Sequence, residues 1–283
     1  MTVILPTFSD DGFVTPEIGA WGEEKYRLVN LYAQMFSASM KRKWECRVYI
    51  DLFAGAGRSR ITGTSRIVPA SPLVALMVEP QFDKYIFCDN DSDNILALKE
   101  RIRRHNANVE TICLPMDVNT RTDEILKEIP RARSGYKVLT FCFVDPFNLK
   151  DLAFQTIERL SLRFVDFLVL IASDMDATRN VFTYESIENK TVERFLGDPA
   201  WRTEWQQVKS QGVPFGIYLV KRFCKKMEEI GYLPSDVEDM KHVRSTDRNL
   251  PLYHLAFFSK HELALKLWKQ AMKYSEDQID LPW

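Results

Sequence analysis

An acidic residue at the end of an apolar run, followed at once by glycines, is the arrangement in this chain best suited to binding a small molecule. The apolar run 48–50 leads into Asp51, and Phe53, Gly55 and Gly57 lie in the turn that follows. Glycine lets the backbone approach a ligand without Cβ contact. The turn lacks the Lys-Ser/Thr pair of a phosphate-binding loop and the third glycine of a dinucleotide site. We therefore expect a ligand that offers an amine or a hydroxyl rather than a pyrophosphate.

The segment Asp-Leu-Phe-Ala-Gly-Ala-Gly at 51–57 resembles the first motif of Rossmann-like methyltransferases, which bind S-adenosylmethionine (SAM). The resemblance implies that Asp51, Gly55 and Gly57 hold the methionine part of SAM, with Phe53 beside them in the cofactor site. A turn of this composition also occurs by chance in other α/β folds, so a purely structural role stays open.

Two further acids follow predicted strands. Asp89 comes directly after the apolar run 84–88, where a carboxylate can bind both ribose hydroxyls of a nucleoside. The alternative is that Asp89, like Asp91, only caps the helix expected over 92–106. Asp117 follows the next strand and is placed to accept a hydrogen bond from an adenine amino group, although an acid in a loop at a strand end is common.

Asp145, Pro146 and Phe147 follow the apolar run 138–144 and resemble the fourth motif of amino-group methyltransferases, Asp/Asn-Pro-Pro-aromatic. In that motif the acid, or a neighbouring carbonyl, accepts a hydrogen bond from the attacking amine. Proline stiffens the loop, and the aromatic ring can stack on a base. This chain has one proline where the motif usually has two, which leaves the group that holds the nucleophile open. A plain turn after a strand would have the same composition.

Composition limits the function classes. The chain has 283 residues, 46% of them hydrophobic, with no apolar run long enough for a membrane span and no signal-peptide pattern at its start. We therefore expect a cytoplasmic globular protein. The five cysteines include no Cys-x-x-Cys pair and the four histidines are scattered, which predicts no metal site. A net charge of −1 excludes a uniformly basic nucleic-acid binder.

Basic residues do form local clusters. Arg58, Arg60 and Arg66 fall in the segment 58–70, which we expect to be an extra polar loop, a candidate lid over the ligand site. Arg101 lies near the end of a predicted helix, where a cation favours the helix dipole, so we expect it to be solvated.

The order of predicted elements indicates an α/β fold: a doubly wound, mostly parallel sheet of the class I SAM-methyltransferase type, with an antiparallel C-terminal strand pair and a helical insertion. We expect an N-terminal tail over 1–16, then a single Rossmann-like domain over 17–283, with the insertion at about 186–232. Helices are predicted at 17–43, 72–79, 92–106, 121–129 and 151–161, and strands at 47–51, 84–88, 109–114, 138–144, 165–172, 242–247 and 252–258.

Over most of its length the chain resembles the three-Cys-motif partner proteins. The resemblance rests on Trp21 and Lys25, on segments 49–57, 70–76, 143–147 and 253–261, and on Ser173-Asp174 with Arg179-Asn180. It implies a separate partner protein with a three-cysteine motif, typically encoded alongside and often in mobile-element settings. The resemblance to this family implies no demonstrated reaction.

Three functions follow from these patterns. The first is a SAM-dependent methyltransferase acting on an exocyclic amine of a nucleic-acid base. The second is a non-catalytic subunit that keeps the fold and docks the three-cysteine protein. The third is a nuclease whose acids hold Mg²⁺; its candidate ligands are Asp89, Asp91, Asp145, Asp174 and Asp176.

Overall fold

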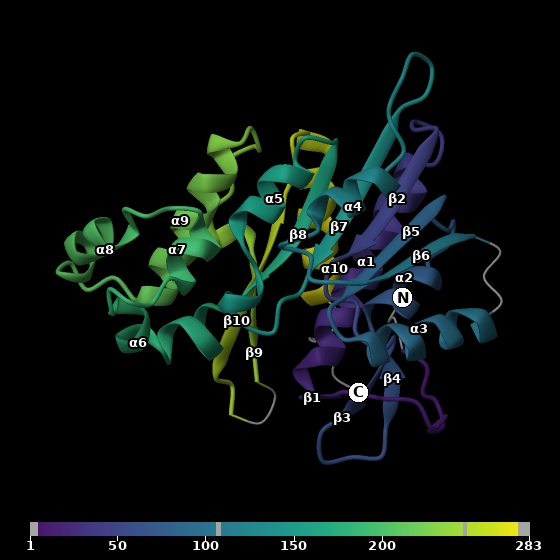
Figure 1. The fold of residues 1–283 in the computed structure, drawn as a ribbon, viewed down its shortest axis with the longest axis horizontal. Coiled ribbons are helices and arrows are strands. Elements are labelled where there is room, and N and C mark those ends of the chain that lie inside the picture. Colours follow the sequence, from purple (N-terminus) through teal and green to yellow (C-terminus); the bar gives the residue numbers. More distant parts are fainter. Residues whose placement is uncertain (1–4, 106–108, 246–247, 277–283) are drawn as a thin grey trace.

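A seven-stranded sheet forms the centre of the computed structural model, which describes residues 5–105, 109–245 and 248–276 (Figure 1). The strand order is β6-β5-β2-β7-β8-β10-β9. The strands are β2 (Cys46–Asp51), β5 (Lys84–Asp89), β6 (Glu110–Pro115), β7 (Val138–Val144), β8 (Val165–Ile171), β9 (Lys241–Arg244) and β10 (Pro251–Phe258). The first five are parallel, whereas β10 is antiparallel to both β8 and β9.

This topology confirms the predicted fold class, a doubly wound, mostly parallel sheet of the class I SAM-methyltransferase type with an antiparallel C-terminal pair. The chain starts the sheet at β2, builds outward through β5 and β6, and returns to place β7 on the other side of β2. Ligands of such sheets bind beyond the carboxyl ends of the strands, at the point where the strand order reverses. The β2–β7 pair therefore marks where a site is expected.

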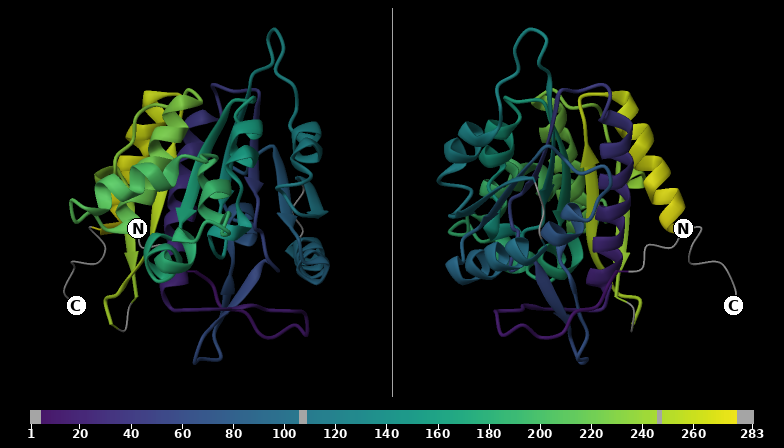
Figure 2. Two further views of the ribbon diagram at one scale, coloured as in Figure 1. Left: turned by 60° about the vertical axis from the view of Figure 1, so that its left-hand side comes forward. Right: turned by 90° about the vertical axis from the view of Figure 1, so that its right-hand side faces the viewer.

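Helices cover both faces of the sheet. Figure 2 shows α1 (Trp21–Met40) and α10 (Glu262–Glu276) on one side and α4 (Thr122–Glu128) and α5 (Phe154–Leu160) on the other. Because both faces are covered, every residue of β7 is buried. The remaining α-helices are α2 (Ser71–Leu76), α3 (Ser92–His105), α6 (Val181–Glu185), α7 (Thr191–Leu196), α8 (Trp201–Lys209) and α9 (Phe215–Glu229). None of the helices described is long and apolar enough to cross a membrane.

The segment expected to be an extra loop forms a hairpin instead. Strands β3 (Arg58–Ile61) and β4 (Ile67–Pro69) pair with each other, and β1 (Glu17–Ile18) adds to the edge of β3. The arginines of this hairpin are not a free basic patch, because each is ion-paired with an acid. The pairs are Arg58 with Asp11 at 3.0 Å, Arg60 with Asp10 at 2.7 Å and Arg66 with Glu23 at 2.6 Å.

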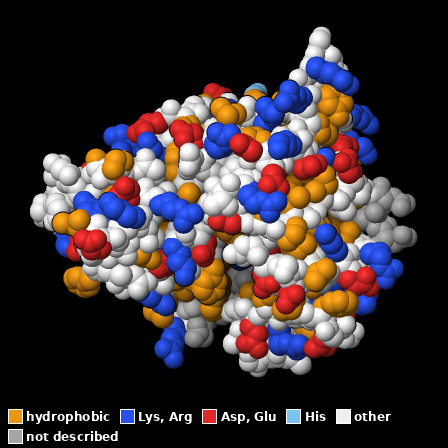
Figure 3. Space-filling model, viewed as in Figure 1, with side chains coloured by type: hydrophobic (Ala, Val, Ile, Leu, Met, Phe, Trp, Pro, Cys, Tyr) orange, Lys and Arg blue, Asp and Glu red, His pale blue; other side chains and the backbone are white. Residues whose placement is uncertain are grey.

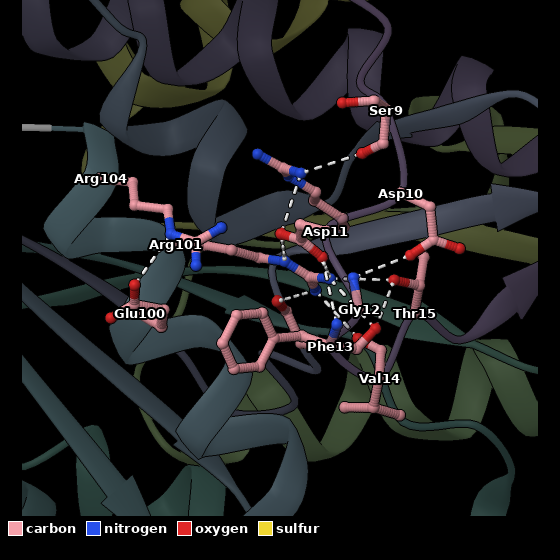
Figure 4. A network of polar contacts seen from close by, with 12 residues as sticks. Ser9, Asp10, Asp11, Gly12, Phe13, Val14, Thr15, Glu100, Arg101 and Arg104 are labelled. Atoms are coloured by element: carbon pink, nitrogen blue, oxygen red, sulfur yellow. Dashed lines mark hydrogen bonds and ion pairs between the residues drawn. The ribbon is translucent and has the colours of Figure 1, made fainter.

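Arg101 of α3 is buried, contrary to the expectation that it is solvated. Its guanidinium binds both carboxylate oxygens of Asp11, at 2.7 and 3.0 Å, and donates to Thr15 Oγ1 at 2.9 Å (Figure 4). It also donates to the carbonyl of Ala56, inside the glycine-rich turn, at 2.7 Å. One side chain thus fastens the N-terminal segment to the turn after β2.

Candidate functional site

A cavity of about 550 Å³ lies beyond the carboxyl ends of β2, β5, β6 and β7. Its volume falls within the range of small-molecule sites, roughly 300–1,000 Å³. Five of the predicted site residues line it: Phe53, Asp89, Asp117, Asp145 and Phe147. The other lining residues are Leu52, Asn90, Asn94, Met116, Val118, Asn119, Lys150, Asp151 and Arg194.

Asp51, the acid that ends β2, lies beneath this surface and is fully buried. Its Oδ1 accepts the backbone N–H of Phe53 at 3.2 Å. Among the described residues no donor meets hydrogen-bond geometry at its Oδ2, although the Ser71 hydroxyl lies close enough to interact with the carboxyl. Burial raises the pKa of Asp51 to about 7, although the Ser71 hydroxyl acts to lower it, and the nearby Asp145 carboxylate adds to the rise. An unpaired buried oxygen is unfavourable, so a donor from a ligand in the adjacent cavity would stabilise this acid.

The two glycines of the turn have different surroundings. Both have positive φ, 59° at Gly55 and 80° at Gly57. A Cβ at Gly55 would meet no atom within 4 Å, whereas one at Gly57 would lie 2.8 Å from Leu98 Cδ1 of α3. Gly57 therefore allows the turn to pack on α3, and its close neighbour is a core side chain rather than the cavity.

Asp89 lines the cavity and accepts hydrogen bonds from the glycine turn and from residues at the start of α3. Its Oδ2 accepts the N–H of Gly55 at 2.8 Å, and its Oδ1 accepts Asp91 N at 2.9 Å and Asn94 Nδ2 at 3.2 Å. A carboxylate offers about four acceptor positions. Three are used by these contacts within the chain, and the ribose-binding role of Asp89 stays a prediction. The same contacts hold the glycine turn against the end of β5.

Asp117 is exposed between two buried side chains, Met116 and Val118. Its Oδ1 accepts both the backbone N–H and the side-chain amide of Asn119, at 2.9 and 3.0 Å. Asn119 in turn donates to the carbonyl of Asp151, at 2.8 Å. This network holds the end of β6 against the segment after β7 and keeps the Asp117 carboxylate at the cavity wall.

Asp145 is ion-paired with Lys25 of α1, with 2.5 Å between Lys25 Nζ and Asp145 Oδ2. Both side chains are largely buried, with exposed fractions of 12% and 14%. Burial alone would lower the pKa of Lys25, but the Asp145 carboxylate outweighs it and the pKa lies above its ordinary value. The hydroxyl of Tyr253, on β10, is buried with no hydrogen-bond partner among the described residues, and it lies near this ion pair as well as Glu24 and Tyr26.

The two residues after Asp145 differ sharply in exposure. Pro146 is buried, whereas Phe147 is 81% exposed although it lines the cavity. The next turn, Leu149–Asp151, is capped by Asp151, whose Oδ2 accepts the backbone N–H of Asn148 at 3.1 Å, while Asp151 N donates to the Asn148 carbonyl. A rigid loop thus presents an aromatic ring to solvent at the edge of the cavity, a position that core packing does not explain.

The acids proposed as Mg²⁺ ligands do not assemble into one cluster among the residues the structure describes. Asp145 is bound by Lys25, and Asp91 accepts the N–H of Asp93 at the start of α3. Asp176 accepts hydrogen bonds from Leu149 N at 2.8 Å, from the Tyr184 hydroxyl at 2.6 Å and from Asn180 Nδ2 at 2.8 Å. These contacts engage three of the five candidate acids, and the nuclease hypothesis stays a prediction.

No protein-family model and no curated protein matches this sequence, so membership of the three-Cys-motif partner family stays a prediction. Solved structures do match. A Legionella pneumophila protein is 11% identical with a TM-score of 0.49, over 91% of this chain and 92% of that one. Magnesium protoporphyrin IX methyltransferase of Synechocystis, with bound S-adenosylhomocysteine, is 9% identical with a TM-score of 0.41, over 84% of each chain.

Trm1 of Pyrococcus horikoshii, in complex with SAM, is 8% identical with a TM-score of 0.46, over 93% of this chain and 61% of that one. Likenesses this distant carry no inference about activity or substrate. The fold assignment rests on the order and direction of the strands in this chain, and the site must be judged on its own chemistry.

Proposed function

We propose that this chain is a SAM-dependent methyltransferase that acts on an exocyclic amine of a nucleic-acid base. The observation that carries the proposal is the Asp145–Phe147 loop, which places a fixed carboxylate and an exposed aromatic ring on the same cavity. That combination suits a flat substrate with an amine at its edge.

The donors of SAM match the acceptors of the cavity. SAM carries ribose hydroxyls and an adenine amino group, and the acids at the ends of β5 and β6, Asp89 and Asp117, line the cavity with acceptor positions unused. The buried carboxyl of Asp51 precedes the lining residues Leu52 and Phe53, and we expect the ammonium of SAM to bind on that side of the cavity. Bound SAM would supply the methyl group.

Asp145 would hold the acceptor amine. Lys25 binds its Oδ2, which leaves Oδ1 free to accept a hydrogen bond from an NH₂ group. The ion pair fixes the carboxylate, so the amine is oriented without further loss of side-chain freedom. Phe147 would stack on the base, a contact worth about 1–3 kcal/mol.

Two positively charged side chains lie at the cavity, where a polynucleotide backbone would approach. Lys150 and Arg194 line the cavity and are exposed, and Arg194 Nη1 donates to the carbonyl of Lys150 at 3.1 Å. Elsewhere on the face seen in Figure 3, basic and acidic side chains are interspersed. We therefore expect binding through a few phosphates, weakened as salt concentration rises.

The first experiment measures the cofactor by calorimetry with SAM and S-adenosylhomocysteine. Asp89→Ala should weaken SAM binding about tenfold or more, because a buried ribose hydroxyl loses its acceptor, which costs about 1–3 kcal/mol. Asp91→Ala is the matched control, since Asp91 also caps α3 but does not line the cavity. Equal affinity in the two variants would disprove the ribose assignment.

The second experiment measures transfer of labelled methyl groups to DNA and RNA. Asp145→Asn should lower turnover strongly and leave SAM affinity nearly unchanged. Phe147→Ala should mainly weaken acceptor binding. Leu162→Ala is the control, because Leu162 is also exposed, at 71%, but it precedes β8 and does not line the cavity. Transfer that survives Asp145→Asn would place the chemistry elsewhere.

A docking subunit for a three-cysteine-motif protein is the second candidate. It is supported by the sequence resemblance and by two exposed apolar side chains after β8, Phe182 at 83% and Ile187 at 77%. Tight SAM binding without transfer to either polymer, with or without the partner, would favour this function over catalysis.

A further inference from the structure

Two histidines meet beside the end of β8, at the same edge of the sheet as the cavity. In the β9–β10 hairpin His242 is the register partner of His254, and His254 is in turn the partner of Ile171 on β8. Ser173 and Asp174 follow that strand in a π-helix over Ser173–Thr178. Single turns of π-helix are rare and are frequent at functional sites.

The four side chains contact one another directly. Ser173 Oγ lies 2.7 Å from His254 Nδ1 and donates to Asp174 Oδ2 at 2.9 Å. His242 Nε2 lies 3.0 Å from the same Asp174 oxygen. The two imidazole rings stack with centroids 4.1 Å apart and planes within 6° of parallel.

We assign the tautomer of His254 from these contacts. The Ser173 hydroxyl gives its only proton to Asp174, so in the contact with His254 it acts as the acceptor and Nδ1 carries the hydrogen. The Nε2 of His254 then holds a free lone pair. A hydrogen bond of this kind to the second ring nitrogen is the usual support of a metal-ligating histidine.

We infer that Asp174, His242 and His254 form a binding site for a divalent transition-metal ion of the Zn²⁺ class, supported by Ser173. Within the described residues, one ligand atom from each of the three lies within 4.8 Å of the others. Ligands of a tetrahedral Zn²⁺ bound at about 2.0–2.2 Å are roughly 3.3 Å apart. Closing the site therefore requires the stacked rings to tilt, by movements of the order of 1 Å.

Sheet stability does not account for His254. Every residue of β10 from Leu252 to Phe258 is buried. His254 is the one member of this run whose side chain is neither a hydrocarbon nor a tyrosine. Burying a polar ring costs free energy that an apolar side chain would not. Placing it opposite a second histidine and beside a carboxylate produces a set of N and O donors that suits Zn²⁺.

The site has three protein ligands, so one position stays open for water or a ligand. His242 also lines a cavity of about 360 Å³, together with Glu24, Lys241 and Arg244. Glu24 precedes Lys25, the partner of Asp145, on α1. The proposed metal site therefore adjoins the methyl-acceptor end of the fold, but it stands on its own contacts and does not depend on methyl transfer.

The test is direct metal binding to the full chain. Protein treated with chelator and dialysed should take up a single Zn²⁺ or Co²⁺ per chain, with the visible absorption of four-coordinate Co²⁺ and a higher Tm. Asp174→Asn, His242→Gln and His254→Gln should each lose the Co²⁺ spectrum. Ser173→Ala should weaken binding by about 10–100-fold, the usual effect of losing the group that supports a ligand.

His105→Gln is the matched control, because His105 is exposed at the end of α3 and its loss should change nothing. His242 is 35% exposed, so His242→Gln should fold even if the buried His254 does not tolerate replacement. Absence of stoichiometric binding by the parent chain would overturn the inference. So would a Co²⁺ spectrum that persists in a folded His242→Gln or Asp174→Asn variant.

Discussion

Lys25 Nζ lies 2.5 Å from Asp145 Oδ2, which joins the first long helix to the turn after β7 across 120 residues of sequence. Through this ion pair, α1 helps to position Asp145 at the cavity. It fixes one oxygen of the acid and leaves the other available at the cavity wall.

Breaking this pair should be costly. Lys25→Met leaves a largely buried carboxylate without its partner, so we expect a loss of about 3–5 kcal/mol in the free energy of unfolding. Adding Asp145→Asn should recover part of that loss, because the unpaired charge is removed. Urea unfolding of the two single variants and of the double variant gives the coupling free energy between Lys25 and Asp145. A loss below about 1 kcal/mol in Lys25→Met would show that the pair behaves as a surface ion pair.

The two glycines should respond differently to substitution. Gly55→Ala should lose about 1–2 kcal/mol, the cost of a left-handed backbone with a Cβ. Gly57→Ala should lose that amount and about 1–3 kcal/mol more, because its Cβ meets Leu98 at 2.8 Å and the core must repack. Thermal or urea unfolding ranks the variants, and equal losses would contradict the packing role of Gly57.

The interaction of Arg101 with Asp11 should make the free energy of unfolding depend on pH in the acid range. Its hydrogen bonds to Asp11 hold the pKa of that carboxyl at about 2, below the ordinary value of 3.8. The folded state therefore releases the proton more readily than the unfolded state, so the contribution is complete above about pH 4 and is lost as the pH falls towards about 2.

Unfolding free energies measured across that window should fall more steeply for the parent than for Asp11→Asn. Asp10→Asn is the control, since Asp10 pairs with Arg60 but is 57% exposed. An Asp10 variant that flattens the curve as much as the Asp11 variant would refute the special role of the buried arginine.

Asp51 should have the opposite effect on how the free energy of unfolding changes with pH. Burial raises its pKa from 3.8 to about 7, so the folded state keeps a proton that the unfolded state releases. Stability should fall by up to about 1.4 kcal/mol per pH unit as the pH rises from about 4 to about 7, then level off. Asp51→Asn should remove this slope.

A second buried acid, Asp166 on β8, also has its pKa raised by burial to about 7 and gives the same sign. Each single Asn variant should therefore remove part of the slope and the double variant more. A slope that is unchanged in Asp51→Asn would mean that this carboxyl is ionised in the folded protein at pH 5.

Local patterns were enough to predict the sheet. The strand over 138–144 coincides with β7, since a run buried on both faces is apolar throughout and its ends are polar. The helix expected from Pro72 begins at Ser71. Strands separated by helices then leave few topologies, because crossovers between parallel strands are right-handed.

Contacts between distant segments could not be predicted in the same way. Arg101 has the position of a solvated helix end, and only the fold shows that the N-terminal segment covers it. The pairing of His242 with His254 depends on the register of the hairpin, which a one-residue shift would have changed. The cofactor and acceptor roles of the predicted site residues remain predictions.

The position of β10 has a consequence for how the chain is made. β10 lies between β8 and β9 in space but follows both of them in sequence. Until β10 has been synthesised, β8 therefore has an unpaired edge and β9 lacks its partner in the sheet. An open apolar edge is a site of association between chains. A chain shortened before Pro251 should therefore aggregate rather than yield a smaller working protein, and partially synthesised chains should depend on chaperones until the final strand is inserted.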